Sequence, residues 1–310
     1  MSKRRRVGDH LDDQYLRSVD RISNLPWHIL DDILGRLPIK DAVRTTILSK
    51  QWRNKWFDLS KLHFDDSSLS RRGGCKLADV NLLVNLVYHV LLCHRGPIHT
   101  FSLSTFYQPR FSDLDYWISF ISRKNIKELA FGLSIGFNTI DEYVIPPSLF
   151  SCQQLTHLHL KNATLFPPYT FPGFRNLVSL RLNNYTNYHD ELTNLIRKCP
   201  VLERVELDNF QNYFCLKIEA LKLKYLLLNG ILGVIVLKNC PVLADVSMIM
   251  VSGFFPMCSF QRRRDPPPFL LLLGSSSQSE EPYITWILPE DSQVTTWAPA
   301  SSLPCVKVQS

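Results

Sequence analysis

The chain has 310 residues, of which 45% are hydrophobic and 20% charged, and its formal net charge is +7 at pH 7. This balance is typical of a soluble globular protein, and the length allows two domains or one domain followed by an elongated array. Lys and Arg are spread along the chain among Asp and Glu, so the charge does not form the basic stripe of a nucleic-acid-binding protein. We therefore do not expect nucleic-acid binding.

Residues 1–19 contain a short basic cluster, Lys3 to Arg6, in a stretch that we predict to be disordered. Such a cluster is typical of a nuclear import signal and also of a solvated terminus. No apolar segment of a signal peptide follows it, and the eight cysteines contain no Cys-x-x-Cys pair. We expect reduced thiols and a protein of the nucleus, the cytoplasm or both.

A first folded unit is predicted over residues 20–62. Pro26 suits the first turn of a helix that Asn24 can cap, and Pro38 disfavours its continuation. A second helix is expected from about Asp41 to Leu48, and Ser49 can cap a third. The first helix carries one apolar stripe, made of Ile29, Leu30, Ile33, Leu34 and Leu37. Three such short helices bury little apolar surface, so the unit benefits from a partner.

This unit resembles an F-box of the plant type. The matching residues are Ile22-Ser23, Leu25-Pro26, Ile29-Leu30, Ile33-Leu34, Leu37-Pro38, Ala42-Val43-Arg44, Leu48-Ser49-Lys50, Trp52-Arg53, Trp56 and the run LHFDD. The resemblance implies docking onto the Skp adaptor of a Skp-cullin-F-box (SCF) ubiquitin ligase and, through the adaptor, onto cullin. The adaptor-binding residues that it implies are Leu25, Pro26, Ile29, Leu30, Leu37, Pro38, Val43, Leu48 and Trp52. Each could instead belong to a private core, and Trp52 and Trp56 fit internal packing with an edge left for the partner.

Residues 63–94 are predicted to form a helical linker, because Leu82, Leu83, Leu86, Val87, Val90 and Leu91 follow helical spacing. The apolar window 80–93 contains Asn85 and His89 and is shorter than the ~20 apolar residues of a bilayer span. We expect no membrane insertion.

The pattern L-x-x-L-x-L recurs through residues 95–250. It begins at Ile98, Ile126, Leu155, Leu177, Leu202, Leu223 and Leu243, at intervals of 20 to 29 residues. This is the period of leucine-rich repeats, in which each unit adds one strand and needs its neighbours to bury its apolar face. The fold class that follows is α/β, a three-helix F-box followed by a leucine-rich-repeat solenoid with a parallel sheet and an irregular C-terminal tail. Cys152, Cys199 and Cys240 each precede a repeat by three residues, where a small apolar side chain fits the core.

Alternate residues of each predicted strand point away from the core onto the concave side of the array. The target-binding residues predicted on this face are His157, His159, Lys161, Arg181, Asn183, Arg204, Glu206 and Asp208. Tyr225, Asn229 and Asp245 occupy the same positions further on. The face is polar and mixed in sign, which favours recognition of a protein. No third ligand is spaced to join His157 and His159 in a metal site, so no metal is predicted.

The last segment, residues 251–310, holds eight of the 19 prolines and no further repeat. Its Pro- and Ser-rich composition predicts an extended or disordered tail. Similar plant F-box proteins carry a C-terminal FBD domain that we do not find here, so a truncated or alternatively spliced product is one hypothesis.

No Gly-rich phosphate loop, His-Glu-x-x-His motif or nucleophile elbow is present, so no catalytic residue and no cofactor are predicted. The chain resembles plant F-box proteins with leucine-rich repeats, which implies a non-catalytic substrate-recognition subunit of an SCF ligase whose repeats bind the target protein. Two alternatives are a leucine-rich-repeat scaffold outside any ligase and an RNA-associated protein that uses Lys3 to Arg6 and Arg262 to Arg264.

Overall fold

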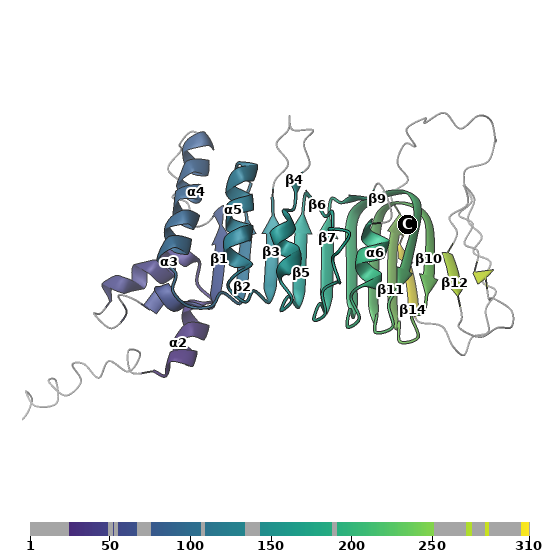
Figure 1. Cartoon of the computed structure of the whole chain (residues 1–310), viewed down its shortest axis with the longest axis horizontal. Helices are drawn as coiled ribbons and strands as arrows, with labels where there is room; N and C mark the ends of the chain where they lie inside the picture. Colours follow the sequence, from purple (N-terminus) through teal and green to yellow (C-terminus); the bar gives the residue numbers. More distant parts are fainter. Residues whose placement is uncertain are drawn as a thin grey trace, which may run out of the picture.

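The fold was analysed in a computed structural model of the chain. It describes residues 25–48, 52, 55–66, 76–106, 109–133, 143–187, 191–250, 271–274, 283–284 and 305–309. Within these ranges the molecule is an α/β structure in which one mostly parallel sheet runs the length of the array and short helices lie at one end and along one face (Figure 1). The predicted α/β class with a parallel sheet is therefore confirmed.

Two short α-helices open the described chain. Helix α2 spans Trp27–Leu34 and α3 spans Ile39–Arg44, and Pro26 and Pro38 occupy their N-cap positions rather than their first turns. A 3-10 helix, η1 (Thr45–Ile47), continues α3 where a longer second helix was predicted. Trp56 lies in a second 3-10 helix, η2 (Lys55–Asp58), and not in a full α-helix; Ser49, the predicted cap of that helix, lies outside the described residues.

Each predicted L-x-x-L-x-L segment contributes a strand of the main sheet. Eight strands pair side by side in chain order, and every pairing between them is parallel. They are β1 (Lys61–Asp65), β2 (Thr100–Ser104), β3 (Glu128–Gly132), β5 (His157–Lys161), β7 (Ser179–Asn183), β9 (Arg204–Glu219), β10 (Tyr225–Lys238) and β11 (Asp245–Met250). Strand order that follows chain order is what stacked repeats require, because each unit contacts only its neighbours.

The first of these strands lies where a linker was predicted. Leu59, Leu62 and Phe64 follow the repeat spacing and are at most 1% exposed, so the boundary predicted after residue 62 falls inside β1. Helix α4 (Lys76–Cys93) then returns along the sheet with Leu83 and Val87 fully buried. The described residues of 63–94 therefore lie in β1 and α4, and α4 packs its buried side chains into the core beneath the sheet.

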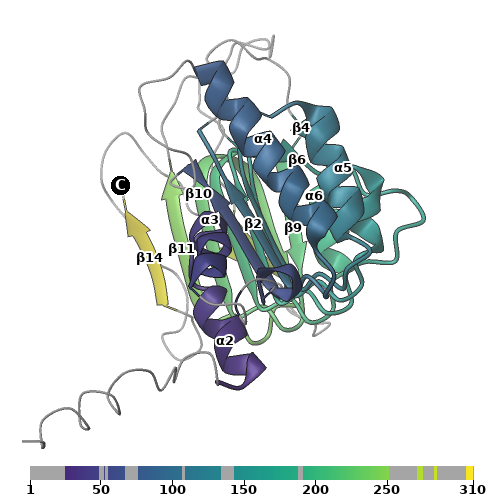
Figure 2. The same cartoon turned by 90° about the vertical axis from the view of Figure 1, so that its left-hand side faces the viewer.

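Helices cover one face of the sheet, and no helix of the described array lies on the other. Figure 2 shows α4, α5 (Phe111–Ile121) and α6 (Glu191–Arg197) stacked along the same face. A 3-10 helix, η4 (Pro147–Ser151), takes the corresponding place between β4 and β5. Short strands complete this side: β4 (Tyr143–Val144) pairs with β6 (Ala163–Thr164), and β8 (Thr186–Asn187) pairs with the second half of β9.

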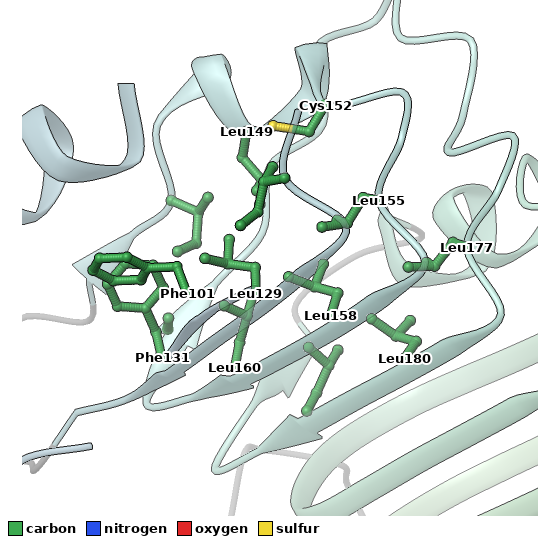
Figure 3. Close-up of a cluster of buried hydrophobic side chains, with 14 of the residues drawn as sticks. Phe101, Leu129, Phe131, Leu149, Cys152, Leu155, Leu158, Leu160, Leu177 and Leu180 are labelled. Carbon is green, nitrogen blue, oxygen red and sulfur yellow. The ribbon is translucent and has the colours of Figure 1, made fainter. Parts of the chain in front are cut away.

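The core lies between the sheet and this helical layer. Inward side chains of successive strands, including Phe101, Phe131, Leu158 and Leu180, gather there with Leu149 of η4 (Figure 3). Each is at most 1% exposed, and burying a side chain of this size contributes about 1.5–3 kcal/mol. The residues before the repeats also lie inward: Cys152, Phe174 and Cys199 are buried, and Cys240 is partly buried.

Asparagine side chains form a ladder from the residues that follow β5 and β7 to a residue within β9. Asn162, Asn184 and Asn209 adopt left-handed backbone conformations, with φ of 60°, 54° and 48°. The Asn184 side chain donates to Asn162 Oδ1 at 2.5 Å, and Asn209 donates to Asn184 Oδ1 at 2.6 Å. In the next repeat this position is Gly230, with φ of 143°. Corresponding positions of three successive repeats are therefore bonded to one another through their side chains.

Three short strands occur in the segment that was predicted to be irregular. They are β12 (Leu271–Gly274), β13 (Tyr283–Ile284) and β14 (Cys305–Gln309), and β14 pairs in parallel with β11. The prediction of an entirely irregular tail is thus wrong at these residues. For β14 the reason is that the outer edge of β11 presents backbone N–H and C=O groups with which another strand can pair. The rest of 251–310 and the basic stretch 1–19 lie outside the described residues.

Candidate interaction surfaces

The N-terminal helices present apolar side chains on two sides. Leu30 and Leu34 of α2 are 1% exposed and join the core, whereas Ile29 and Ile33 of the same helix are 40% and 41% exposed. The single stripe that was predicted therefore divides between an inner and an outer side. Ile29 and Ile33, one turn apart, form an outward apolar pair that the described residues do not cover.

The predicted adaptor-binding residues fall into three groups of exposure. Leu30 and Trp52 are buried in the chain's own core, and so offer no surface to a partner. Leu25, Leu37, Pro38 and Val43 are partly buried. Pro26, Ile29 and Leu48 are exposed, and Leu48 is 69% exposed. Three exposed apolar residues of this unit were missing from the prediction: Trp27, Ile33 and Ile47, the last 85% exposed. Together, Ile29, Ile33, Ile47 and Leu48 are called here the apolar outer surface.

The junction between α2 and the sheet is tied by polar and aromatic contacts. The Asp31 carboxylate accepts hydrogen bonds from the backbone N–H of Ser60 at 3.0 Å and from its hydroxyl at 2.6 Å. Lys61, the first residue of β1, lies 3.4 Å from the carboxylate of Asp32. Bonds from a carboxylate to a backbone N–H are among the stronger ones in proteins. They fix the helix against the start of β1.

A buried histidine and stacked rings extend this junction to α4. His94 Nε2 lies 2.8 Å from the Leu59 carbonyl, so the Nε2–H tautomer can donate to it, and burial lowers the pKa of His94. Trp56 stacks on His89 of α4 with ring centroids 6.1 Å apart. The same hydrophobic cluster runs from Leu30 to Val246. The N-terminal helices and the sheet therefore share one core.

The bare face of the sheet carries the predicted target-binding residues. Strand register aligns His157 with Ser179 and Arg204 in one row, and His159 with Arg181 and Glu206 in the next. Lys161, Asn183 and Asp208 align in a third row. All eight predicted residues thus lie on three neighbouring strands, and we call them, with Tyr225 and Asn229 of β10, the polar face.

Two arginines on the polar face share one recessed carboxylate. The Glu206 side chain is 11% exposed, and its Oε2 pairs with Arg181 while its Oε1 lies 3.4 Å from Arg204. The Arg204 guanidinium also lies over the Tyr225 ring, 4.3 Å from its centroid, which adds a cation–π attraction. Glu206 thus holds two guanidinium groups that belong to adjacent strands.

A second network links β5, β7, β9 and β10. Asp208 accepts hydrogen bonds from the side-chain amides of Asn183 at 2.8 Å and Asn229 at 2.6 Å. Asn183 Oδ1 in turn lies 2.9 Å from His159 Nε2. Burial lowers the pKa of His159, so its ring is neutral near pH 7 and Nε2–H can donate. Six of the eight predicted residues therefore belong to one or other of these two networks. His157 and Lys161 are exposed on the same face.

The described residues show no further arrangement of reactive groups. Burial raises the pKa of Cys152 to about 12 and that of Cys199 to about 11, which leaves both thiols protonated and weakly nucleophilic. Within the described ranges, no three His, Cys, Asp or Glu side chains converge as metal ligands. Nor does any described helix combine the length and apolar composition needed to cross a bilayer.

Comparisons with known proteins match both parts of this architecture. Residues 22–64 match the F-box domain family, and residues 114–262 match the leucine-rich repeats of the family described as FBD-associated F-box protein At5g56370. Three similar proteins are from Arabidopsis thaliana. The F-box/FBD/LRR-repeat protein At1g13570 is 41% identical over 233 residues, which cover 75% of this chain and 54% of that protein. The F-box/LRR-repeat protein At3g26922 is 26% identical over 264 residues, which cover 75% of this chain and 83% of that protein. The FBD-associated F-box protein At5g56380 is 32% identical over 200 residues, which cover 63% of this chain and 44% of that protein.

An F-box followed by leucine-rich repeats defines a class of plant proteins. This chain belongs to the plant F-box/leucine-rich-repeat proteins, as the resemblance of its motifs predicted. Its match spans about half the length of the first of these relatives. The matches indicate no enzyme family.

Proposed function

We propose that this protein is a substrate-recognition subunit of an SCF ubiquitin ligase. In this proposal the F-box docks onto a Skp-type adaptor, which connects it to cullin, and the parallel sheet is a leucine-rich-repeat solenoid whose polar face binds the target protein. The chain itself contributes no catalytic group; it raises the local concentration of the target beside the ubiquitin-transferring partner. The proposed activity lies in the nucleus, the cytoplasm or both.

The observation that carries the proposal is the apolar outer surface of the F-box. Ile47 and Leu48 are 85% and 69% exposed, in a segment where Leu34 and Ile39 are 1% exposed. Side chains of this kind on short helices are typical of a helix surface that docks against a partner. Covering them would remove apolar area from water at roughly 25 cal/mol per Å². The F-box match supplies the kind of partner, because F-box domains generally bind Skp-type adaptors.

The shared core supports a rigid connection between adaptor and target. The contacts of Asp31 with Ser60 and of Trp56 with His89 join the F-box to the first strand-helix unit. A target bound on the polar face would therefore keep a fixed orientation relative to the adaptor. Positioning of this kind is what a non-catalytic ligase subunit contributes to the rate of transfer.

Co-purification with the adaptor tests the proposal. The intact chain, co-expressed with a Skp-type adaptor and cullin, is expected to retain both, and Leu48→Asp is expected to lose them because a charge would enter the apolar interface. Leu92→Asp is the matched control, since Leu92 of α4 is also 69% exposed but lies outside the F-box. Failure of the intact chain to retain the adaptor would favour a repeat scaffold outside any ligase. Equal loss in both variants would show that the interface does not depend on the F-box surface.

A further inference from the structure

One repeat of the array carries a proline-rich segment in its helical layer. Between β6 and β7 the sequence reads LFPPYTFPGF over residues 165–174, and the structure places no helix there. Phe171 and Phe174 pack on Phe150 of η4, with ring centroids 5.0 and 6.0 Å from that of Phe150, and β6 lies beside the helices (Figure 2). The segment is therefore on the opposite side of the sheet from the polar face.

Both ends of this segment are fixed in the core. Leu165 at its start is 1% exposed, and Phe171 is 4% exposed. The Phe171 carbonyl accepts a hydrogen bond from the Lys198 ammonium at 2.7 Å. Gly173, with φ of 101°, packs so closely on the Lys198 backbone that a Cβ would collide with its carbonyl oxygen. The five residues between these anchors, 166–170, are therefore held in place, and a partner would not have to order them on binding.

The residues between the anchors present two aromatic rings to solvent. Phe166 is 44% exposed and Tyr169 is fully exposed, while Pro167 and Pro168 between them are partly exposed. Proline fixes its own φ near −65° and biases the residue before it toward extended backbone, so this stretch favours the polyproline II helix. That helix has three residues per turn. Phe166 and Tyr169, three residues apart, therefore lie along the same edge of it.

The backbone of the same stretch offers acceptors and almost no donors. Neither proline has an N–H group. The Pro168 carbonyl accepts from the Phe171 N–H at 2.9 Å, whereas the carbonyls of Phe166 and Pro167 accept no hydrogen bond from the described residues. No charged side chain occurs from residue 162 to residue 174. A partner for this surface must therefore recognise apolar shape and carbonyl groups rather than charge.

We propose that residues 166–169 are a docking site for a proline-recognition domain of the WW kind, whose groove is lined by aromatic rings and carries side-chain donors. Such grooves bind polyproline II segments because the ligand already has its bound conformation. The two prolines would lie between the rings, the Pro167 carbonyl would accept from a donor, and Tyr169 would enter a pocket beside them. The inference goes beyond the proposed function, since a domain on the helical layer leaves the polar face free.

Isothermal titration calorimetry of the full-length chain with a panel of purified WW domains tests the inference. At least one domain is expected to bind, and Tyr169→Ala and Pro167→Ala are each expected to weaken that binding at least about tenfold. Tyr116→Ala is the matched control, since Tyr116 of α5 is also exposed. Pro267→Ala is the control for the other proline run, at 266–268. Both controls are expected to bind as the unsubstituted chain does. Because the Tyr169 ring is fully exposed, its removal is expected to leave the urea midpoint unchanged.

The outcomes separate this inference from the proposed function. Absence of binding by every domain of the panel would overturn it, and so would binding that Tyr169→Ala and Pro167→Ala leave unchanged. A dimer that sedimentation detects and Tyr169→Ala abolishes would show instead that a second copy of the chain covers the segment. The WW domain and the adaptor are expected to bind one chain together. If the adaptor fails to co-purify while the domain binds, the inference stands without the F-box part of the proposed function.

Discussion

The asparagine ladder gives the sharpest quantitative prediction about the array. Asn184 is its middle rung: its side chain donates to Asn162 Oδ1 and accepts from Asn209. Replacing Asn184 with Ala removes both hydrogen bonds, each with a net contribution of about 1 kcal/mol. The φ of 54° at this position adds about 1 kcal/mol, because alanine tolerates left-handed backbone less well than asparagine. We expect the free energy of unfolding to fall by about 3 kcal/mol.

A glycine substitution separates the two contributions. Asn184→Gly also loses the hydrogen bonds, but glycine adopts positive φ without steric cost. It is therefore expected to be less destabilising than Asn184→Ala by roughly 0.5–1 kcal/mol. Asn194→Ala is the control, since Asn194 is exposed on α6, and is expected to change stability by less than about 0.5 kcal/mol.

The assay is equilibrium urea unfolding followed by tryptophan fluorescence, with the transition slope compared between variants to check that the cooperative unit is unchanged. A loss for Asn184→Ala within about 0.5 kcal/mol of zero would show that the ladder contributes nothing beyond ordinary turn solvation. A greater loss for the glycine than for the alanine variant would contradict the assignment of strain to the backbone conformation.

Three further predictions concern the turns, the junction and the core. Gly230→Ala is expected to cost more than about 3 kcal/mol in urea unfolding, because a Cβ there would lie 2.1 Å from the Phe210 carbonyl oxygen at a φ of 143°; a loss below about 1 kcal/mol would contradict this. Since the pKa of His94 is lowered in the folded state, its contribution to stability is complete above about pH 6.5 and declines as pH falls through the folded value. His94→Gln, which keeps a donor for the Leu59 carbonyl, is therefore expected to make thermal stability fall less steeply below pH 6.5, and an unchanged slope would refute this. Cys152 is expected to resist iodoacetamide at pH 8 in the folded protein and to react once urea unfolds the chain, as judged by mass spectrometry of its peptide; labelling of folded protein at the unfolded rate would contradict its burial.

The repeat spacing predicted most of the sheet because its physical cause is local. A strand with apolar residues at alternating positions must hide one side, and an interval of 20 to 29 residues brings the next strand beside it. The unit that was missed begins at Leu59. Two of its core residues, Leu62 and Phe64, lie inside the LHFDD run, which also fits the F-box resemblance. Only their burial in the core that they share with α4 shows that the segment belongs to both.

Burial within the F-box was less predictable, because periodicity identifies the apolar positions of a helix but not which of them a neighbour covers. Leu30 and Ile29 are adjacent in the sequence and equally apolar. In the structure, Leu30 is 1% exposed and Ile29 is 40% exposed. The difference depends on the direction in which α2 leaves the sheet, which the contacts of Asp31 with Ser60 fix through residues far apart in the chain.

The polar face shows the same limit with a functional consequence. The sequence placed Arg181, Arg204 and Glu206 on one side of the sheet and implied a surface of mixed sign. What a partner meets depends instead on depth, because a recessed carboxylate that two guanidinium groups already engage has little left to offer to solvent or ligand. The arginines keep most of their donors and remain 47% and 48% exposed. A strand composition that is nearly balanced in charge thus leaves the two arginines at the surface, while Glu206 and Asp208 are recessed and engaged by neighbouring side chains.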